Sequence, residues 1–214
     1  MSTDLIVLGL TKIGESAVVL HCLSRDYGRK GFVVRVSRRT PMALYLPLNI
    51  LEAEVEENPK SSLWKISSAT AKLPLHSIRS NIYKNTMTLF MSEVLYRAVH
   101  EGGAEDGLFD WCERSIATLD ALTGDFSNFH LRFLLELAVA LGFSPSAEDL
   151  APFAGEHLQT LSAFISLPFA ESMLLPLSGD RRNALAQVLL KYLSYHTESS
   201  LNVKSLSVLR DLYG

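Results

Sequence analysis

The stretch at residues 16–39, SAVVLHCLSRDYGRKGFVVRVSRR, decides how the first part of this chain is expected to fold. Apolar and polar residues alternate before and after Gly28, and a period of two is typical of antiparallel strands joined by a turn. In the second strand Phe32, Val34 and Val36 share one face, and Val33, Arg35 and Ser37 share the other. The stretch therefore predicts a β-hairpin.

Three more extended runs flank this hairpin within the first 76 residues. Residues 4–15 form an apolar run, and residues 62–75 form the last extended run of this part. Between them, residues 49–59 alternate Ala53 and Val55 with glutamates. Five short strands, all expected to be antiparallel, favour a small barrel, and a five-stranded barrel of this size is most often an OB-fold.

Beyond the fifth run the apolar residues recur at helical spacing. The helix expected within residues 126–145 is apolar on most sides, so it should be the centre of a bundle, with Ser127 and Asn128 as capping candidates. Helices are expected within residues 76–103, 107–124, 126–145, 181–199 and 201–214, with short or irregular helices over 149–179. The prediction is an α+β protein with two domains, an OB-fold over 1–76 and an all-α helical domain over 77–214.

The composition fits a globular protein with an uneven distribution of charge. Of 214 residues, 48% are hydrophobic, which is enough to bury a sizeable core. The formal net charge of −3 conceals 11 Lys+Arg against 7 Asp+Glu over residues 1–80, and 9 against 16 over residues 81–214. This asymmetry indicates that the first part meets a polyanion, and chance variation between two surfaces is the alternative.

Six cations lie in or beside the hairpin. Strands 2 and 3 of an OB-fold bind oligonucleotides, and guanidinium groups there would displace counterions from phosphates. An aromatic side chain could stack on bases. The candidate DNA-binding residues are Arg25, Arg29, Lys30, Arg35, Arg38, Arg39 and Tyr27. The alternative is a solvated strand edge on which positive charge prevents aggregation.

The sequence contains no recognisable catalytic or metal-binding motif. GEHLQ at residues 155–159 lacks the second histidine of H-E-x-x-H, and no G-x-S-x-G is present. GLTKIGES at residues 9–16 lacks the ending of a phosphate-binding loop. Cys22 and Cys112 are far apart, and the six histidines are scattered. We therefore expect no catalytic residue, no metal and no cofactor.

The same sequence gives expectations about cellular location. Two cysteines without a framework indicate a reducing interior, and the start MSTDLIVLGL lacks the basic region of a signal peptide. The apolar stretch at residues 160–179 contains Glu171 and two prolines, so it is not expected to cross a membrane. We expect a cytoplasmic protein.

In their order and spacing, these features resemble the DNA repair and recombination protein RecO family over nearly the whole chain. The resemblance rests on Glu15-Ser16, Gly28-Arg29 and Arg38-Arg39 around the hairpin, on SEVLYRAVHEGGAEDGLFDWCERSIATLD at residues 92–120, and on Arg132-Phe133, Leu141-Gly142-Phe143 and Lys204-Ser205. Many members carry four zinc-binding cysteines after the Leu-Gly-aromatic helix, whereas residues 144–164 here contain none. The chain therefore resembles a member without the zinc finger, in which packing must replace the metal.

The resemblance implies a recombination mediator associated with the nucleoid. Such proteins bind single- and double-stranded DNA, anneal complementary strands and, with RecR, help to load RecA onto strands coated with single-stranded-DNA-binding protein. The helical domain would recognise the acidic, hydrophobic-ended tail of that protein. Arg132 is the candidate cation for the tail, and its pairing with a neighbouring acid is the alternative. An RNA-associated OB-fold protein and an adaptor that binds only proteins are the other open functions.

Overall fold

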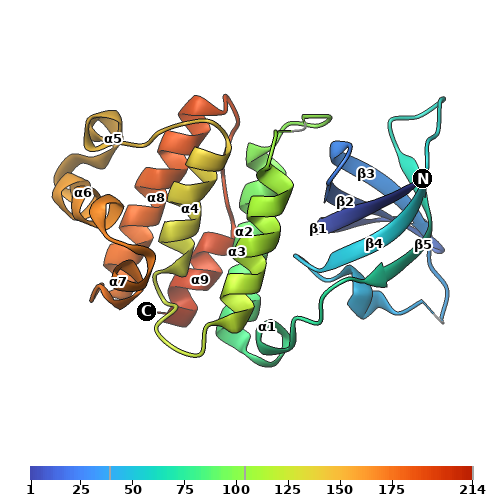
Figure 1. Ribbon diagram of the computed structural model, residues 1–214, viewed down its shortest axis with the longest axis horizontal. Coiled ribbons are helices and arrows are strands. Elements are labelled where there is room, and N and C mark those ends of the chain that lie inside the picture. Colours follow the sequence, from blue (N-terminus) through green and yellow to red (C-terminus); the bar gives the residue numbers. More distant parts are fainter. Residues whose placement is uncertain (39, 104, 214) are drawn as a thin grey trace.

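In a computed structural model that describes residues 1–38, 40–103 and 105–213, a β-barrel lies beside a stack of helices (Figure 1). The strands are β1 (Ser2–Ile13), β2 (Ala17–Ser24), β3 (Gly28–Arg35), β4 (Ile50–Glu56) and β5 (Trp64–Ala71), with the 3-10 helix η1 (Met42–Tyr45) between β3 and β4. The predicted alternation is confirmed, because Phe32 and Val34 of β3 and Ala53 and Val55 of β4 are buried in the barrel.

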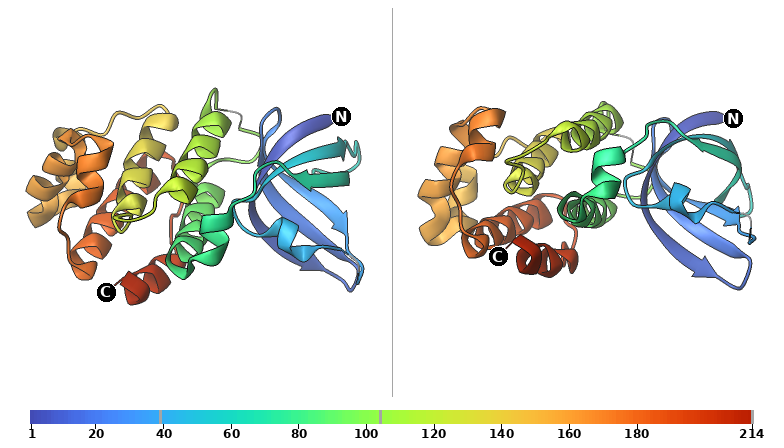
Figure 2. Two further views of the ribbon diagram at one scale, coloured as in Figure 1. Left: turned by 60° about the horizontal axis from the view of Figure 1, so that its bottom comes forward. Right: turned by 90° about the horizontal axis from the view of Figure 1, so that it is seen from below.

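The five strands close in the order β1-β2-β3-β5-β4, and β4 pairs with β1 (Figure 2). A closed five-stranded barrel followed by helices confirms the predicted OB-fold and helical layout. The expectation that all strands are antiparallel was wrong, because β3 and β5 run parallel. Directions must alternate around an antiparallel ring, so a closed ring with an odd number of strands contains at least one parallel pair.

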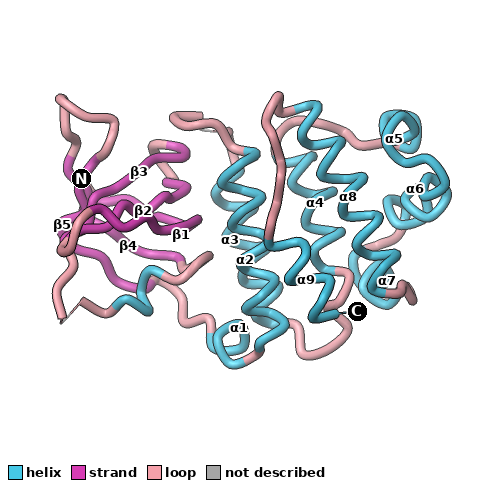
Figure 3. Tube along the Cα trace, turned by 180° about the vertical axis from the view of Figure 1, so that it is seen from behind, coloured by secondary structure: helices cyan, strands magenta, loops and turns pink. Residues whose placement is uncertain are grey.

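The helices form layers beside the barrel (Figures 1 and 3). They are α1 (His76–Ser80), α2 (Ile82–Ala98), α3 (Leu108–Ala121), α4 (Phe129–Ala140), α5 (Ala147–Ala154), η2 (Gly155–His157), α6 (Leu158–Ser166), α7 (Phe169–Leu174), α8 (Gly179–His196) and α9 (Ser205–Tyr213). Helices α2 and α3 lie next to the barrel, and α5 to α7 lie farthest from it. Helix α4 contacts α2, α3, α7 and α8, as expected for the centre of the bundle.

The long helix expected over residues 76–103 is broken at Asn81 into α1 and α2. The side-chain oxygen of Asn81 accepts hydrogen bonds from the backbone N–H groups of Tyr83 (2.9 Å) and Lys84 (3.2 Å), so it caps α2. Asn128 also stands at an N-cap position, before α4, but its side-chain amide donates to the Ser172 carbonyl at 3.0 Å. Asn128 therefore ties the start of α4 to α7 instead of capping its own helix.

The cysteine-free region at residues 144–164 is filled by α5, η2 and α6. Leu150, Leu161 and Phe164 are fully buried there. The backbone N–H of Asp149 donates to the Ser146 hydroxyl oxygen at 3.2 Å, and the Ser146 N–H donates to the Asp149 carboxylate at 3.1 Å. The Ser146 hydroxyl also donates to this carboxylate at 2.7 Å, and this bond, together with the bond from the Ser146 N–H, lowers the pKa of Asp149. Apolar packing and a capping box thus organise this region.

Strand β1 joins the barrel to the helices. Leu5 and Val7 are buried inside the barrel, whereas Ile6 and Leu8 are buried in the core that contains the helices. Successive side chains of a strand point to opposite faces, so one strand serves both cores. The barrel and the helices therefore meet across a buried apolar interface.

Candidate nucleic-acid interface

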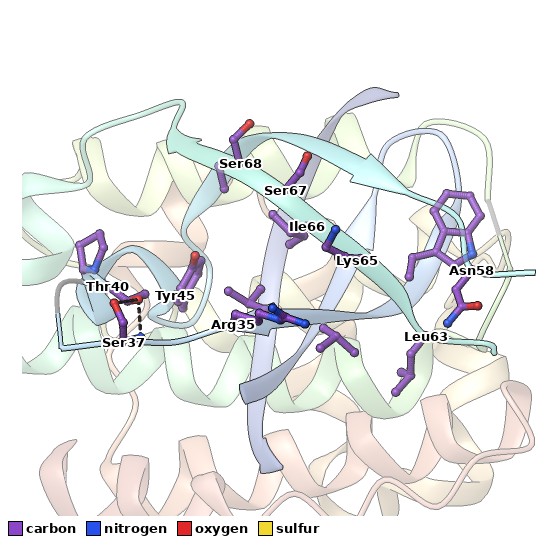
Figure 4. A pocket seen from close by; sticks show the side chains of 15 residues that line it. Arg35, Ser37, Thr40, Tyr45, Asn58, Leu63, Lys65, Ile66, Ser67 and Ser68 are labelled. Carbon is purple, nitrogen blue, oxygen red and sulfur yellow. Dashed lines mark hydrogen bonds between the residues drawn. The ribbon is translucent and has the colours of Figure 1, made fainter. Parts of the chain in front are cut away.

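A groove opens in the barrel wall between β3 and β5, with a volume of about 730 Å³ (Figure 4). The two strands are paired only at Phe32–Trp64 and Val33–Lys65. Just beyond, Ser67 is skipped in the register between β4 and β5, and such a bulge bends the strand that carries it. We call the space the β3–β5 groove, and its walls are residues 33–35 of β3 and residues 64–69 of β5.

Two cations lie at the rim of the β3–β5 groove, one on each wall (Figure 4). The side chain of Arg35 is exposed and makes no hydrogen bond or ion pair with another residue that the structure describes. Lys65 pairs with Glu56 at 2.9 Å, but both side chains are more than half exposed, so water and salt weaken this pair. Arg38 is exposed in the turn after β3. The rim therefore presents positive charge to solvent.

The floor of the β3–β5 groove is apolar. Val34, Tyr45 and Ile66 line it and are almost fully buried. Burial raises the pKa of Tyr45, so its phenol remains neutral at physiological pH. Ser37, Thr40, Ser67 and Ser68 also line the groove. An apolar floor below a cationic rim suits an extended chain that carries negative charge on one side.

Arg25 lies away from this groove, at the junction between the barrel and α3. Its guanidinium pairs with Asp4 at 3.2 Å, with Glu113 at 2.9 Å and with Asp110, and it stacks over the Phe109 ring at 4.3 Å. The hydrogen bond from Arg25 lowers the pKa of Asp110. In this arrangement Arg25 holds strand and helix together.

Lys72 joins the same junction from the segment after β5. It pairs with Asp4 at 2.7 Å and with Glu113 at 2.8 Å, and its hydrogen bond to Asp4 is the main reason why its pKa is raised. Two cations and three carboxylates, from both parts of the chain, thus form one network.

Arg29 faces α2. Its Nε donates to the Val99 carbonyl at 2.6 Å, and its guanidinium lies over the Tyr96 ring at 4.9 Å. The backbone carbonyl of Arg29 also accepts from Gly102 at 2.9 Å. Through these contacts Arg29 attaches the hairpin to the end of α2.

Tyr27 and Lys30 meet at Trp64. The Tyr27 ring lies 4.7 Å from the Trp64 ring, and the Lys30 ammonium lies 4.6 Å from it. Trp64 is itself 8% exposed, so this cluster closes one end of the barrel. Tyr27 remains half-buried, with its hydroxyl toward the Met1 sulfur.

The predicted cations therefore fall into separate places. Arg35 and Arg38 are exposed at or near the β3–β5 groove, whereas Arg25 and Arg29 contact the helices. Arg39 lies outside the described residues. Arg29 and Arg35 share one face of β3 but lie at opposite ends of the strand. The turn end of the hairpin, with Arg25 and Arg29, meets α2 and α3.

Sequence reasoning missed Lys65. The run at residues 62–75 was read as a strand, but a lone lysine among serines gives no local signal of a site. Only the closure of β3 on β5 brings Lys65 and Arg35 to the same groove. To predict that Lys65 lines the site, one would have had to know that the third and fifth strands pair.

Arg132 borders a second groove of about 410 Å³ on the helical part. Its Nε donates to Glu136 at 2.7 Å, and its Nη1 donates to the Leu167 carbonyl at 3.1 Å. Leu135, Val139, Pro145 and Ile165 give this groove apolar walls, and the Val139 side chain is 60% exposed. Arg132 thus pairs with a neighbouring acid, as the alternative expected, and it also borders an apolar groove.

Among the described residues, no three His, Cys, Asp or Glu side chains are grouped so that they could hold a metal ion. Cys22 and Cys112 are both buried. Within the same residues, no helix combines the length and the apolar character that crossing a bilayer requires.

Two family models match this chain. Residues 1–74 match the model described as Recombination protein O N terminal, and residues 79–151 match Recombination protein O C terminal. The first match covers the barrel, and the second begins in α1 and ends in α5. Together the two matches span the barrel and the helices that lie next to it.

Curated relatives are similar along the whole chain. A protein named DNA repair protein RecO from Flavobacterium psychrophilum is 29% identical over 236 aligned positions, which cover 100% of this chain and 99% of the relative. One of the same name from Phocaeicola vulgatus is 28% identical, with 97% of each chain covered. Another from Bacteroides fragilis is 33% identical over 74% of this chain and 66% of the relative.

Proposed function

This chain belongs to the RecO family, whose relatives are named DNA repair proteins, and we propose that it is a non-enzymatic recombination mediator in DNA repair. It binds single- and double-stranded DNA and anneals complementary strands. It works in the cytoplasm, at the nucleoid.

The observation that carries this proposal is the unpaired Arg35 on the wall of an apolar-floored groove. An arginine that no described carboxylate neutralises keeps its full attraction for phosphate, and phosphate contacts release counterions. Lys65 and Arg38 add positive charge beside it. The junction network engages Arg25, and the contacts with the end of α2 engage Arg29, so both act as structural cations. The DNA path therefore uses Arg35, Arg38 and Lys65 first.

Annealing fits this chemistry because it forms no covalent bond. Two complementary strands repel each other through their phosphates, and a cationic surface that neutralises one strand lowers that barrier. The acidic β4 face, with Glu52, Glu54 and Glu56 exposed, keeps DNA away from the opposite side of β5. The phosphates of a DNA strand in the groove would thus be neutralised only on the side that faces the protein's cations.

The groove beside Arg132 supports the second part of the proposal. An acidic tail with a hydrophobic end needs an apolar groove with a cation next to it, and Arg132 with Val139 and Ile165 offers both. We propose that the tail of single-stranded-DNA-binding protein binds here, and that RecR and RecA act with this chain on the coated strand.

The DNA proposal is tested by fluorescence anisotropy with labelled oligo-dT, its duplex and the matching RNA over a range of salt. The double variant Arg35→Ala/Lys65→Ala should bind oligo-dT about tenfold more weakly, and its log–log salt slope should become shallower by about 0.7 for each phosphate that the protein no longer neutralises. The control Lys60→Ala/Lys191→Ala removes the same charge from exposed sites outside the groove.

Equal binding and slope in both double variants would favour the adaptor without nucleic-acid binding. A clear preference for RNA would favour the RNA-associated alternative.

The tail site is tested by annealing of strands coated with single-stranded-DNA-binding protein, either intact or without its C-terminal tail. Arg132→Ala should slow annealing relative to the wild type on the intact coat, because the tail loses its cation. On the tailless coat the two proteins should anneal equally. An equal effect of Arg132→Ala on both coats would contradict a tail site at this groove.

A further inference from the structure

The β3–β5 groove exposes an unfinished strand edge as well as cations. β5 pairs with β4 along residues 65–71, but on its other edge it pairs with β3 only at Trp64 and Lys65. Between described residues, no loop or side chain bonds the backbone of residues 66–69 on the groove side. A strand paired on one edge leaves about half of its backbone N–H and C=O groups free on the other.

We propose that this edge accepts an extended peptide from a partner protein, in which apolar and acidic residues alternate. The peptide would run antiparallel to β5 and complete the sheet by β-augmentation. Its apolar side chains would face Val34, Tyr45 and Ile66 on the floor, and its acidic side chains would face the rim at Arg35.

The barrel already contains the pattern that β5 accepts. On the opposite edge of β5, β4 carries Ala53 and Val55 inward and glutamates outward. Glu56 of β4 reaches Lys65 of β5 at 2.9 Å. A second acidic strand on the open edge would repeat this arrangement, with Arg35 in place of Lys65 as the facing cation.

Backbone chemistry favours a peptide at this edge over a sugar-phosphate chain. Phosphate oxygens accept hydrogen bonds but donate none, so they would leave the groove-side carbonyls of residues 66–69 unsatisfied. A peptide strand offers both donors and acceptors in register. Binding of the peptide is independent of the proposed function, whereas its competition with DNA for the same groove rests on that function.

The test uses a labelled synthetic peptide with the β4 sequence, ILEAEVEE (residues 50–57), as the probe for the full-length protein. Anisotropy should show saturable binding below about 1 mM, weakened about tenfold or more by Arg35→Glu but less than twofold by Lys60→Glu. Replacing Ala53 of the peptide by proline should abolish binding, because it breaks the strand. Amide NMR shifts should concentrate at residues 66–69.

Several outcomes would overturn the inference. The first is that the peptide does not bind at about 1 mM. The second is that it binds equally well to the Arg35→Glu and Lys60→Glu proteins. The third is that the amide NMR shifts change at residues away from β5. The outcome for DNA is read separately, with unlabelled oligo-dT as the competitor. Peptide binding without any oligo-dT binding keeps the peptide site and removes the DNA proposal. Binding of oligo-dT without any peptide binding keeps the DNA proposal and removes the peptide site.

Discussion

Leu63 packs directly over the backbone of Gly31, where any side chain would collide with it. A Cβ placed on Gly31 would lie 2.6 Å from Cδ2 of Leu63 and 3.4 Å from Cγ1 of Val19. The loop between β4 and β5 therefore reaches its position on β3 because residue 31 has no side chain. This contact precedes the Phe32–Trp64 pair by one residue, so it helps to set the start of the β3–β5 groove.

Replacing Gly31 by alanine should destabilise the protein by about 1–2 kcal/mol, because the added methyl overpacks the contact with Leu63. The measurement is urea unfolding of Gly31→Ala, Leu63→Ala and the double variant. Since the collision involves the end of a side chain, the double variant should be more stable than the sum of the single changes predicts. Strict additivity would contradict a direct steric contact.

Substitutions of Arg25 and Arg35 should separate an effect on stability from an effect on DNA binding. Arg25→Ala should lower the midpoint of urea unfolding, because Asp110 loses its partner while Asp4 and Glu113 keep Lys72. Arg35→Ala should leave stability within about 0.5 kcal/mol, because an exposed, unpaired side chain is removed.

Binding to oligo-dT should respond in the opposite order. Arg35→Ala should make the salt dependence shallower, whereas Arg25→Ala should leave the slope unchanged. If Arg25→Ala alone changed the slope, the DNA path would have to cross the barrel–helix junction.

His130 should make the fold sensitive to acid. Burial, and then the charge of Arg182, lower its pKa from 6.5 to about 3. Below pH 6.5 the unfolded chain takes up a proton that the folded chain refuses until about pH 3. The unfolded state is therefore favoured as pH falls through this window, by about 1.4 kcal/mol per pH unit once well below 6.5.

The measurement is urea unfolding at pH 7, 6 and 5 for wild type, His130→Leu and His76→Ala. The loss of stability between pH 6 and 5 should be smaller in His130→Leu, because the group that titrates is gone. His76 is exposed, so His76→Ala should keep the wild-type pH dependence. Identical pH profiles for all three proteins would show that His130 titrates normally.

Glu93 should hold α9 in place. Its carboxylate accepts hydrogen bonds from the backbone N–H groups of Lys204 (3.1 Å) and Ser205 (2.9 Å) and from the Ser205 hydroxyl (2.7 Å). Partial burial raises its pKa, but these bonds outweigh burial and lower the pKa overall. Its stabilising effect is present above the ordinary value of 4.5 and is lost as pH falls through the lower folded value.

Glu93→Ala should therefore cost about 1–3 kcal/mol and speed hydrogen exchange in residues 205–213, because the N-terminal amides of α9 lose their acceptor. Glu136→Ala is the matched control, since it removes a helical glutamate that pairs only with Arg132 among described residues. Unchanged exchange in α9 would contradict a capping role for Glu93.

Much of the barrel could be predicted because its strands alternate strictly. Phe32 and Val34 share one face by period alone, as do Ala53 and Val55, and all four are buried. The helix expected within residues 181–199 was equally readable, because its apolar residues recur every third or fourth position. The residues of this stripe are buried in α8: Leu185, Val188, Leu189, Tyr192 and Leu193. Local pattern determines which face of an element is buried.

The candidate site was less predictable because it depends on contacts between distant residues. A row of cations in the hairpin cannot reveal that Arg25 meets Asp110 or that Arg29 meets Val99. The break at Asn81 was also missed, because one side chain capping its own helix overrides an otherwise continuous apolar period. Tertiary partners decided where the two arginines lie, whereas a local cap decided the helix break.

The division of β1 between two cores has a mechanical consequence. Domain pairs in one chain swivel when they meet through a small polar contact, but here Ile6 and Leu8 on one side and Leu5 and Val7 on the other anchor the same backbone. This shared anchoring opposes a swivel at the interface, so the β3–β5 groove and the groove beside Arg132 keep a constant separation. Under the proposed function, transfer between DNA in one groove and a peptide tail in the other would come from movement of these ligands and not from the two halves closing toward each other.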